Sequence, residues 1–281
     1  MASSGRVVVL IDLSGTLLVE DMCISGVPAA LRRLKSNPRY AVKFVTNTTK
    51  IAIVYDINSF NIRNHFMLDE SANRLYERLR KLGLDITQSE IFTSLTAAKH
   101  LIKKDNLRPM LFLEKAALED FTDVDIKEPN AVVVGLAPSK FSFTSLNEAF
   151  RLLLDGAKLI AIHKGRYYKQ TDGLSLGPGP FVEALEYAAD VKSQVVGKPE
   201  RAFFLTALAS IDNSLTPQQV VMIGDDVRDD VLGAINAGMH AILVKTGKYC
   251  EGDELEIPET SRNCVETFVE AVDLIEKNLV K

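Results

Sequence analysis

Short runs of β-branched and apolar residues, each followed by an amphipathic stretch, constrain the fold of this chain most strongly. The run "VVVLI" ends at Asp12 and precedes a helical pattern in "PAALRRLKS", and "VVMIG" precedes "VLGAINAG" in the same way. Strands that read as continuous apolar runs are buried on both faces, as in a parallel sheet covered by helices. The sequence therefore predicts a doubly wound α/β core of parallel strands.

The middle of the chain repeats this alternation in "PMLFL", "NAVVVGL" and "AKLIAIHK", between turn signals such as "LGPGP". We interpret 86–180 as a second α/β domain inserted into a core made of 1–85 and 181–281. Within the core, segment 51–69 has neither helical nor strand periodicity, and connections of this length are uncommon. We expect a surface loop there: a genuine insert, a partner-binding loop, or translated non-coding sequence retained by a gene model.

Composition limits the partners of the protein. The 281 residues carry a formal net charge of −4, which argues against non-specific nucleic-acid binding. No apolar run has the length of a signal peptide core or a membrane span, so we expect a cytoplasmic protein without a membrane partner. The three cysteines are few and far apart, which suggests neither a disulfide framework nor a zinc site. A homodimer is left open.

Polar residues stand where several predicted core strands end. They are Asp12, Thr46 with Asn47, Lys198, and Asp225. Ligands of open parallel sheets bind beyond the carboxyl ends of the strands, so these side chains could converge on one site. An aspartate can attack phosphorus, two carboxylates can hold Mg²⁺, and a threonine and a lysine can stabilise a transferring phosphoryl group. Each residue alone also fits an ordinary turn, cap or solvated position, but their joint placement favours a site.

Four ordered motifs carry a family resemblance. "DLSGTL", "FVTNTT", "GKP" and "IGDDVRDD" resemble the motifs of the haloacid dehalogenase superfamily of phosphohydrolases. The middle of the chain resembles the α/β cap of its NagD-like subgroup. The resemblance implies a Rossmann-like core with an inserted cap, and a Mg²⁺-dependent phosphohydrolase that acts on small phosphorylated compounds through an aspartyl-phosphate.

The resemblance also assigns roles to matching residues. Asp12 would be the nucleophile, and Lys198 would neutralise the phosphate and Asp12. Mg²⁺ would be held by Asp12, by the backbone carbonyl of Ser14 and by Asp225, with Asp226 or Asp230 in support. The residues assigned to substrate binding are Leu13, Ser14, Thr46, Asn47 and Lys198.

Ser14 departs from the family pattern, in which an aspartate at this position protonates the leaving oxygen and activates water. A serine hydroxyl is a poor proton donor and acceptor at neutral pH, and lost acid–base help costs about 10²–10⁴-fold in rate. The loss is smallest for good leaving groups, which favours phosphoramidates and pyrophosphate over alkyl phosphates. The alternative is a catalytically weak binding or regulatory protein that kept the phosphate site; dehalogenase chemistry is a distant third.

Overall fold

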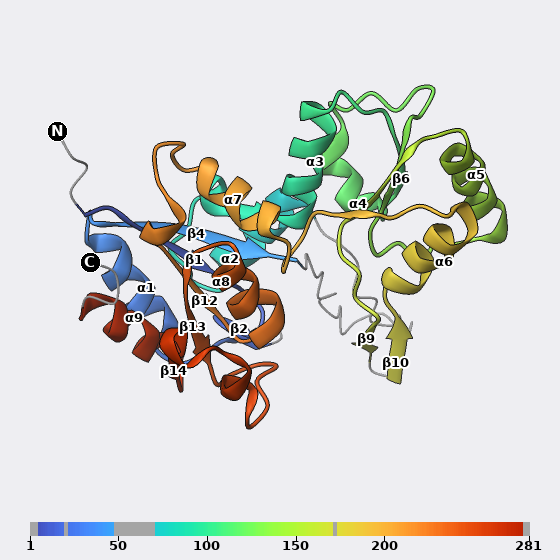
Figure 1. Ribbon diagram of the computed structural model, residues 1–281. Coiled ribbons are helices and arrows are strands. Elements are labelled where there is room, and N and C mark those ends of the chain that lie inside the picture. The colour runs from blue at the N-terminus through green and yellow to red at the C-terminus, as the bar shows by residue number, and fades with distance from the viewer. Residues whose placement is uncertain (1–4, 20–21, 48–70, 171–172, 278–281) are drawn as a thin grey trace, which may run out of the picture. The chain divides into compact units, whose positions relative to one another are not determined.

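The structure is a computed structural model that describes residues 5–19, 22–47, 71–170 and 173–277 (Figure 1). The chain divides into two compact units. The first contains the described residues of Met1–Thr46, Tyr76–Phe92 and Lys198–Lys281, and the second those of Asn47–Leu75 and Thr93–Gly197. The second unit is thus inserted into the first. Segment 51–69, singled out in the sequence, lies outside the described residues.

A six-stranded sheet with the order β14-β13-β12-β1-β4-β5 forms the centre of the first unit. Its strands are β1 (Val7–Ile11), β4 (Tyr40–Thr46), β5 (Ile91–Thr93), β12 (Val220–Gly224), β13 (His240–Val244) and β14 (Cys264–Val265). β1 pairs in parallel with both β4 and β12, and β13 pairs in parallel with β12 and β14. All residues of β1 and β12 are buried, as their continuous apolar sequences predict.

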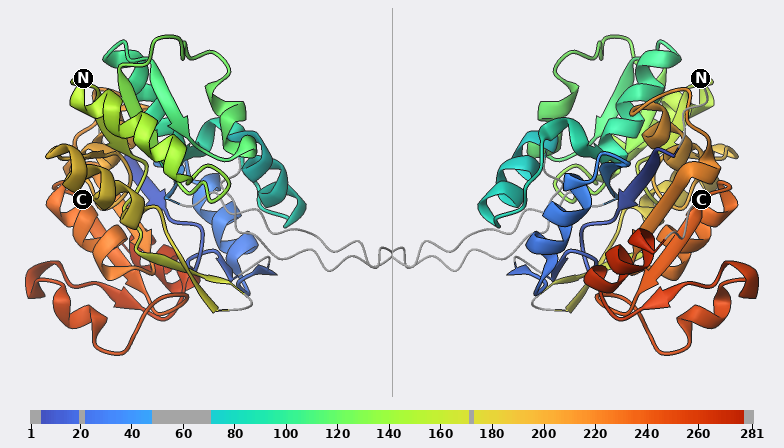
Figure 2. Two further views of the ribbon diagram at one scale, coloured as in Figure 1. Left: turned by 90° about the vertical axis from the view of Figure 1, so that its right-hand side faces the viewer. Right: turned by 90° about the vertical axis from the view of Figure 1, so that its left-hand side faces the viewer.

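The helices of this unit are α1 (Val27–Ser36), α7 (Arg201–Ala209), α8 (Gly233–Asn236), α9 (Phe268–Glu276) and the part of α2 (Ala72–Lys81) that begins at Tyr76, since the first turn of α2 belongs to the second unit. Shorter elements are the hairpin β2 (Leu18–Val19) and β3 (Met22–Cys23), the 3₁₀ turns η1 (Gln88–Glu90), η3 (Pro217–Gln219), η5 (Asp253–Glu256) and η6 (Glu259–Ser261), and the π-helical turn η4 (Val227–Leu232). α1 packs on α9 and α7 packs on α8 (Figures 1 and 2).

The strand order places a topological switch point between β1 and β12. From β1 the chain continues to β4 and β5 on one side, and after the second unit it returns to β12 on the other side. Crossovers between parallel strands are right-handed, so the connections on the two sides run over opposite faces and leave a crevice where they diverge. Asp12 and Asp225 directly follow the two strands that flank this crevice.

The second unit has its own parallel four-stranded sheet with the order β11-β8-β7-β6. Its strands are β6 (Pro109–Phe112), β7 (Ala131–Val134), β8 (Lys158–Ala161) and β11 (Gln194–Val195), with the antiparallel pair β9 (Tyr167–Gln170) and β10 (Gly173–Leu176). Its helices are α3 (Ser94–Lys104), α4 (Lys115–Leu118), α5 (Phe143–Leu154) and α6 (Gly179–Ala189), with the 3₁₀ turn η2 (Glu119–Phe121).

The structure places the unit boundaries differently from the sequence interpretation of 86–180. The stretch 86–92 belongs to the first unit because β5 is the edge strand of the large sheet. The stretch 181–197 belongs to the second unit, because Val182 and Leu185 of α6 are buried against the same core cluster as Val132, and β11 pairs with β8. Turn signals such as "LGPGP" therefore marked the start of α6 rather than the end of the unit.

The predicted α/β class with parallel sheets is confirmed in both units. Within the described ranges, no helix has the length and apolar character needed to cross a membrane.

Candidate active site

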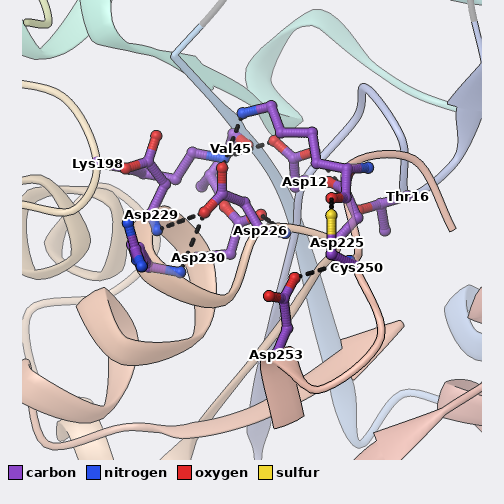
Figure 3. Close-up of polar contacts among 12 residues, drawn as sticks. Asp12, Thr16, Val45, Lys198, Asp225, Asp226, Asp229, Asp230, Cys250 and Asp253 are labelled. Atoms are coloured by element: carbon purple, nitrogen blue, oxygen red, sulfur yellow. Dashed lines mark hydrogen bonds and ion pairs between the residues drawn. The ribbon is translucent and has the colours of Figure 1, made fainter. Parts of the chain in front are cut away.

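A buried ion cluster lies at the switch point of the first unit (Figure 3). Lys198 donates to Asp12 Oδ1 at 2.5 Å, to Asp230 Oδ1 at 2.6 Å and, more weakly, to the Val45 carbonyl at 3.4 Å. Asp12, Lys198 and Asp230 are each at most 5% exposed. Burial alone would lower the pKa of Lys198, but the charges of Asp12 and Asp230 outweigh burial and raise it, so the ammonium stays charged.

Asp225 brings a further carboxylate to Asp12, with Thr16 between them. The Thr16 hydroxyl lies 3.4 Å from Asp12 Oδ2 and 3.3 Å from Asp225 Oδ1. Asp225 is 1% exposed, and burial together with the negative charge of Asp12 raises its pKa to about 7. Asp12 and Asp225 thus lie close together, and within the described residues no lysine or arginine forms an ion pair with Asp225, an arrangement that a bound cation would stabilise.

The turn after β13 holds Asp225 from the side opposite Thr16. The backbone N–H of Lys248 donates to Asp225 Oδ2 at 2.7 Å, and the Thr246 hydroxyl donates to the Gly15 carbonyl. Gly247 has a φ of 56°, and a Cβ there would collide with Asp225 Oδ2 and with Gly15 Cα. The glycine is required both for the left-handed backbone and for the close approach of this turn to Asp225.

The π-helical turn η4 separates the roles of the clustered aspartates that follow β12. Asp226 caps η4 by accepting from the N–H groups of Arg228 and Asp229, and its other oxygen pairs with Lys248 Nζ at 2.8 Å. Asp230 lies one turn later and reaches back to Lys198, while its second oxygen accepts from Asp226 N at 3.2 Å. Of the two supporting candidates, Asp230 therefore contacts the cluster, and Asp226 fixes the turn that carries it.

The remaining predicted residues lie at or near the same strand ends. Thr46, at the end of β4, is buried, and Asn47 accepts a hydrogen bond from Ser94 Oγ through its carbonyl at 3.0 Å. Ser14 is half-buried, one residue past Leu13. The Leu13 side chain is buried in the core and its carbonyl accepts from Leu17 and Leu18, so only its backbone N–H is available for the predicted substrate contact.

The acidic residues of the cluster fit a divalent cation of the magnesium type. Asp12, Asp225 and Asp230 offer carboxylate oxygens within 4.8 Å of one another, and all three are buried. Hard carboxylate oxygens are the ligands that Mg²⁺ takes in proteins. Both oxygens of Asp230 accept from separate donors, Lys198 and Asp226, whereas Asp12 Oδ2 and Asp225 Oδ1 share the single proton of the Thr16 hydroxyl. Asp12 and Asp225 therefore have the oxygens best placed to hold the ion.

Sequence reasoning missed Thr16 and the turn 246–248. A signal for the turn was present: "HAILVKTGKY" is another apolar strand followed by polar residues and a glycine. The sequence interpretation assigned roles at strand ends only to carboxylates, a lysine, a threonine and an asparagine. Thr16 carried no such signal, since it follows the loop glycine and resembles any small residue in a turn.

The fold and the cluster define a class of α/β enzyme with a buried aspartate–lysine site and an inserted second unit. The HAD-hydrolase-like family model matches residues 195–271. The chain is 55% identical to the rat (Rattus norvegicus) haloacid dehalogenase-like hydrolase domain-containing protein 2, over 97% of this chain and 96% of that protein. It is 37% identical to the human (Homo sapiens) phospholysine phosphohistidine inorganic pyrophosphate phosphatase, over 95% and 93%. The chain belongs to the haloacid dehalogenase-like hydrolase family.

Solved structures share the fold. NagD from E. coli has a TM-score of 0.78 and 20% identity, covering 95% of this chain and 98% of NagD. A glycerol phosphate phosphatase from Mycobacterium tuberculosis, solved in complex with magnesium, has a TM-score of 0.74 and 24% identity, covering 94% of this chain and 76% of that one. Both structural alignments cover nearly the whole chain and include residues of both units.

Proposed function

We propose that the protein is a Mg²⁺-dependent phosphohydrolase that acts on small phosphorylated compounds through an aspartyl-phosphate on Asp12. The observation that carries this proposal is the buried pairing of Asp12 with Lys198, beside the unneutralised carboxylate of Asp225. A nucleophilic carboxylate, a fixed cation and a place for a metal are the requirements of phosphoryl transfer to an enzyme side chain.

Each residue has a separate task in the proposed reaction. Lys198 holds Asp12 by one oxygen, so Asp12 Oδ2 is directed toward the side of Asp225 and can attack phosphorus. The leaving group departs as the Asp12–phosphorus bond forms, and attack by water then releases phosphate and regenerates Asp12. Mg²⁺, held by Asp12, Asp225 and the Ser14 carbonyl, would supply positive charge for the phosphate oxygens.

Ser14 restricts the substrates in this scheme. Its hydroxyl can orient water, but it cannot deliver a proton to a poor leaving group at neutral pH. Phosphoramidates and pyrophosphate, whose leaving groups need less help, are therefore the favoured substrate class. The names of the phospholysine phosphohistidine inorganic pyrophosphate phosphatases, 37–38% identical to this chain, support the same class.

The test is a phosphatase screen with Mg²⁺ across alkyl phosphoesters, phosphoramidates and pyrophosphate, comparing the wild type with Asp12→Asn. We expect hydrolysis by the wild type and a loss of about 10³-fold or more in Asp12→Asn, because the amide is not a nucleophile. Circular dichroism and the melting temperature check that the variant remains folded. Equal activity of both proteins would exclude Asp12, and no hydrolysis in any class would favour the binding or regulatory alternative.

A further inference from the structure

A polar cavity lies at the end of the large sheet opposite the active site. It has a volume of about 380 Å³, within the range of small-molecule pockets, and its lining includes Arg6, Lys35, Lys43, Ser89 and Glu90. β4 contributes its first four residues to this cavity, whereas Thr46 at its other end adjoins the active site. Thr46 lies three positions after Lys43, about 10 Å along the strand at the usual rise, so the two sites are distinct.

Lys43 is the unusual residue of this cavity. Its position in the middle of β4 leaves it only 7% exposed, beside Leu10 of β1. Among the described residues, it forms no hydrogen bond and no ion pair within 4 Å. A buried cation without a partner is costly, and burial lowers the pKa of Lys43 accordingly, although the charge of Glu90 partly opposes that effect.

The Lys43 ammonium must reach the cavity. In the described part of the chain, every fully buried side-chain nitrogen and oxygen has a hydrogen-bond partner. Lys43 Nζ has no hydrogen-bond partner, so it is not one of the fully buried atoms. Because Lys43 lines the cavity, we expect the ammonium to be accessible from there.

Glu90, the acidic group of the cavity, is already engaged. It pairs with Lys35 Nζ at 2.9 Å and accepts from the Thr87 backbone N–H at 2.7 Å. Arg6 and Lys43 therefore remain as positive charges that this carboxylate does not match. The charged side chains of the lining carry a net formal charge of +2, which favours an anion over a cation or a neutral ligand.

We propose that this cavity is an anion site in which Lys43 and Arg6 bind a small phosphate-type dianion. The ligand would give Lys43 the ionic partner that the protein does not supply. Lys35 and Ser89 provide further donors at the rim. The site is separate from the catalytic cluster, and the inference does not depend on the proposed hydrolysis.

The test is equilibrium dialysis of the full chain against radiolabelled inorganic phosphate at neutral pH, without divalent metal. We expect the wild type to bind one phosphate more per chain than Lys43→Met, with no change in hydrolytic kcat/KM. Lys43→Arg should retain the site. Lys158→Met is the control, because Lys158 is an exposed lysine of the second unit paired with Asp105, and it should bind phosphate as the wild type does.

The inference is overturned if the wild type and Lys43→Met bind the same amount of phosphate. If Lys43→Met does not fold, Arg6→Met decides the question, since Arg6 is exposed and its loss leaves the core intact. An affinity at least tenfold weaker in Arg6→Met supports the site, and an unchanged affinity rejects it.

Discussion

Ser14 is the residue that most limits the substrate range of the proposed reaction. It lies two positions after Asp12 and is half-buried, and no hydrogen bond joins its hydroxyl to another group in the ranges that the structure describes. In the proposed reaction, a longer acidic side chain at this position would stand beside the transferring phosphoryl group. The serine would therefore leave Asp12 as the nucleophile and remove only the proton donor.

We predict that Ser14→Asp raises kcat/KM for alkyl phosphate esters by about 10²-fold or more, because a carboxylic acid restores general acid–base help. Pyrophosphate hydrolysis should change much less, since its leaving group needs less protonation. Parallel steady-state kinetics on both substrates measure the difference. Ser14→Asn is the control for size and polarity; an equal gain in Ser14→Asn would show that proton transfer is not the cause.

At the scale of elements, the turn after β13 is the part of the site most sensitive to shape. Gly247 and Gly252 both have positive φ, of 56° and 98°. A Cβ on Gly247 would collide with Asp225, whereas no atom lies within 4 Å of a Cβ on Gly252. Alanine costs about 1–2 kcal/mol in a left-handed conformation at either position, so a difference between the two variants reports on Asp225.

We predict that Gly247→Ala raises the Mg²⁺ concentration for half-maximal activity by about tenfold or more, because displaced Asp225 binds the ion less well. Gly252→Ala should lose only the smaller stability that the left-handed backbone costs and should keep the Mg²⁺ dependence of the wild type. Titration of activity with Mg²⁺ in both variants decides it. Identical Mg²⁺ curves for the two would mean that the turn does not position Asp225.

Strand ends made most of this site predictable. Asp12 and Asp225 each follow an apolar strand of the large sheet, and a parallel sheet brings such ends together whatever the details of packing. The prediction that Lys198 also follows a core strand is wrong, because the strand before it, β11, pairs with β8 in the sheet of the second unit. The turn at Gly247 was not predicted, although it follows an apolar strand, because its contribution is a backbone N–H and a lack of side chain rather than a reactive group. The division between Asp226 and Asp230 depends on the π-helical geometry of η4, which four closely spaced aspartates do not reveal.

At the scale of the whole molecule, the α/β class followed from the period of the apolar runs, but the unit boundaries did not. α6 and β11 follow the turn "LGPGP" and could join either sheet by their sequences alone. Only packing decides, because Val182 and Leu185 complete the core of the second unit and β11 extends its sheet. Such choices depend on tertiary contacts between segments far apart in the sequence, which local patterns do not contain.

Segment 51–69 lies outside the described residues, yet the structure fixes both of its flanks. On one side, the Asn47 carbonyl accepts from Ser94 Oγ at 3.0 Å. On the other, Ser71 Oγ donates to Glu119 Oε2 at 2.9 Å. Each anchor is made to a part of the second unit that follows the segment in the chain. The two flanks therefore have attachments that do not require the segment itself.

From the lack of periodicity in the sequence, we predict that a variant without 51–69 folds and keeps equal or higher phosphatase activity. Changing loop length alters the free energy of loop closure by only about 0.6 kcal/mol per doubling, or about 1–2 °C in melting temperature for a chain of this size. Removing its Ile, Phe, Tyr and Met residues should also reduce aggregation.

A variant carrying a Gly/Ser linker of the same length separates the effect of length from that of composition. Thermal unfolding and the Mg²⁺-dependent assay provide the readouts. If the deletion and linker variants both fail to fold, the segment's own side chains contribute to the core, and the sequence interpretation of 51–69 as a surface loop is wrong.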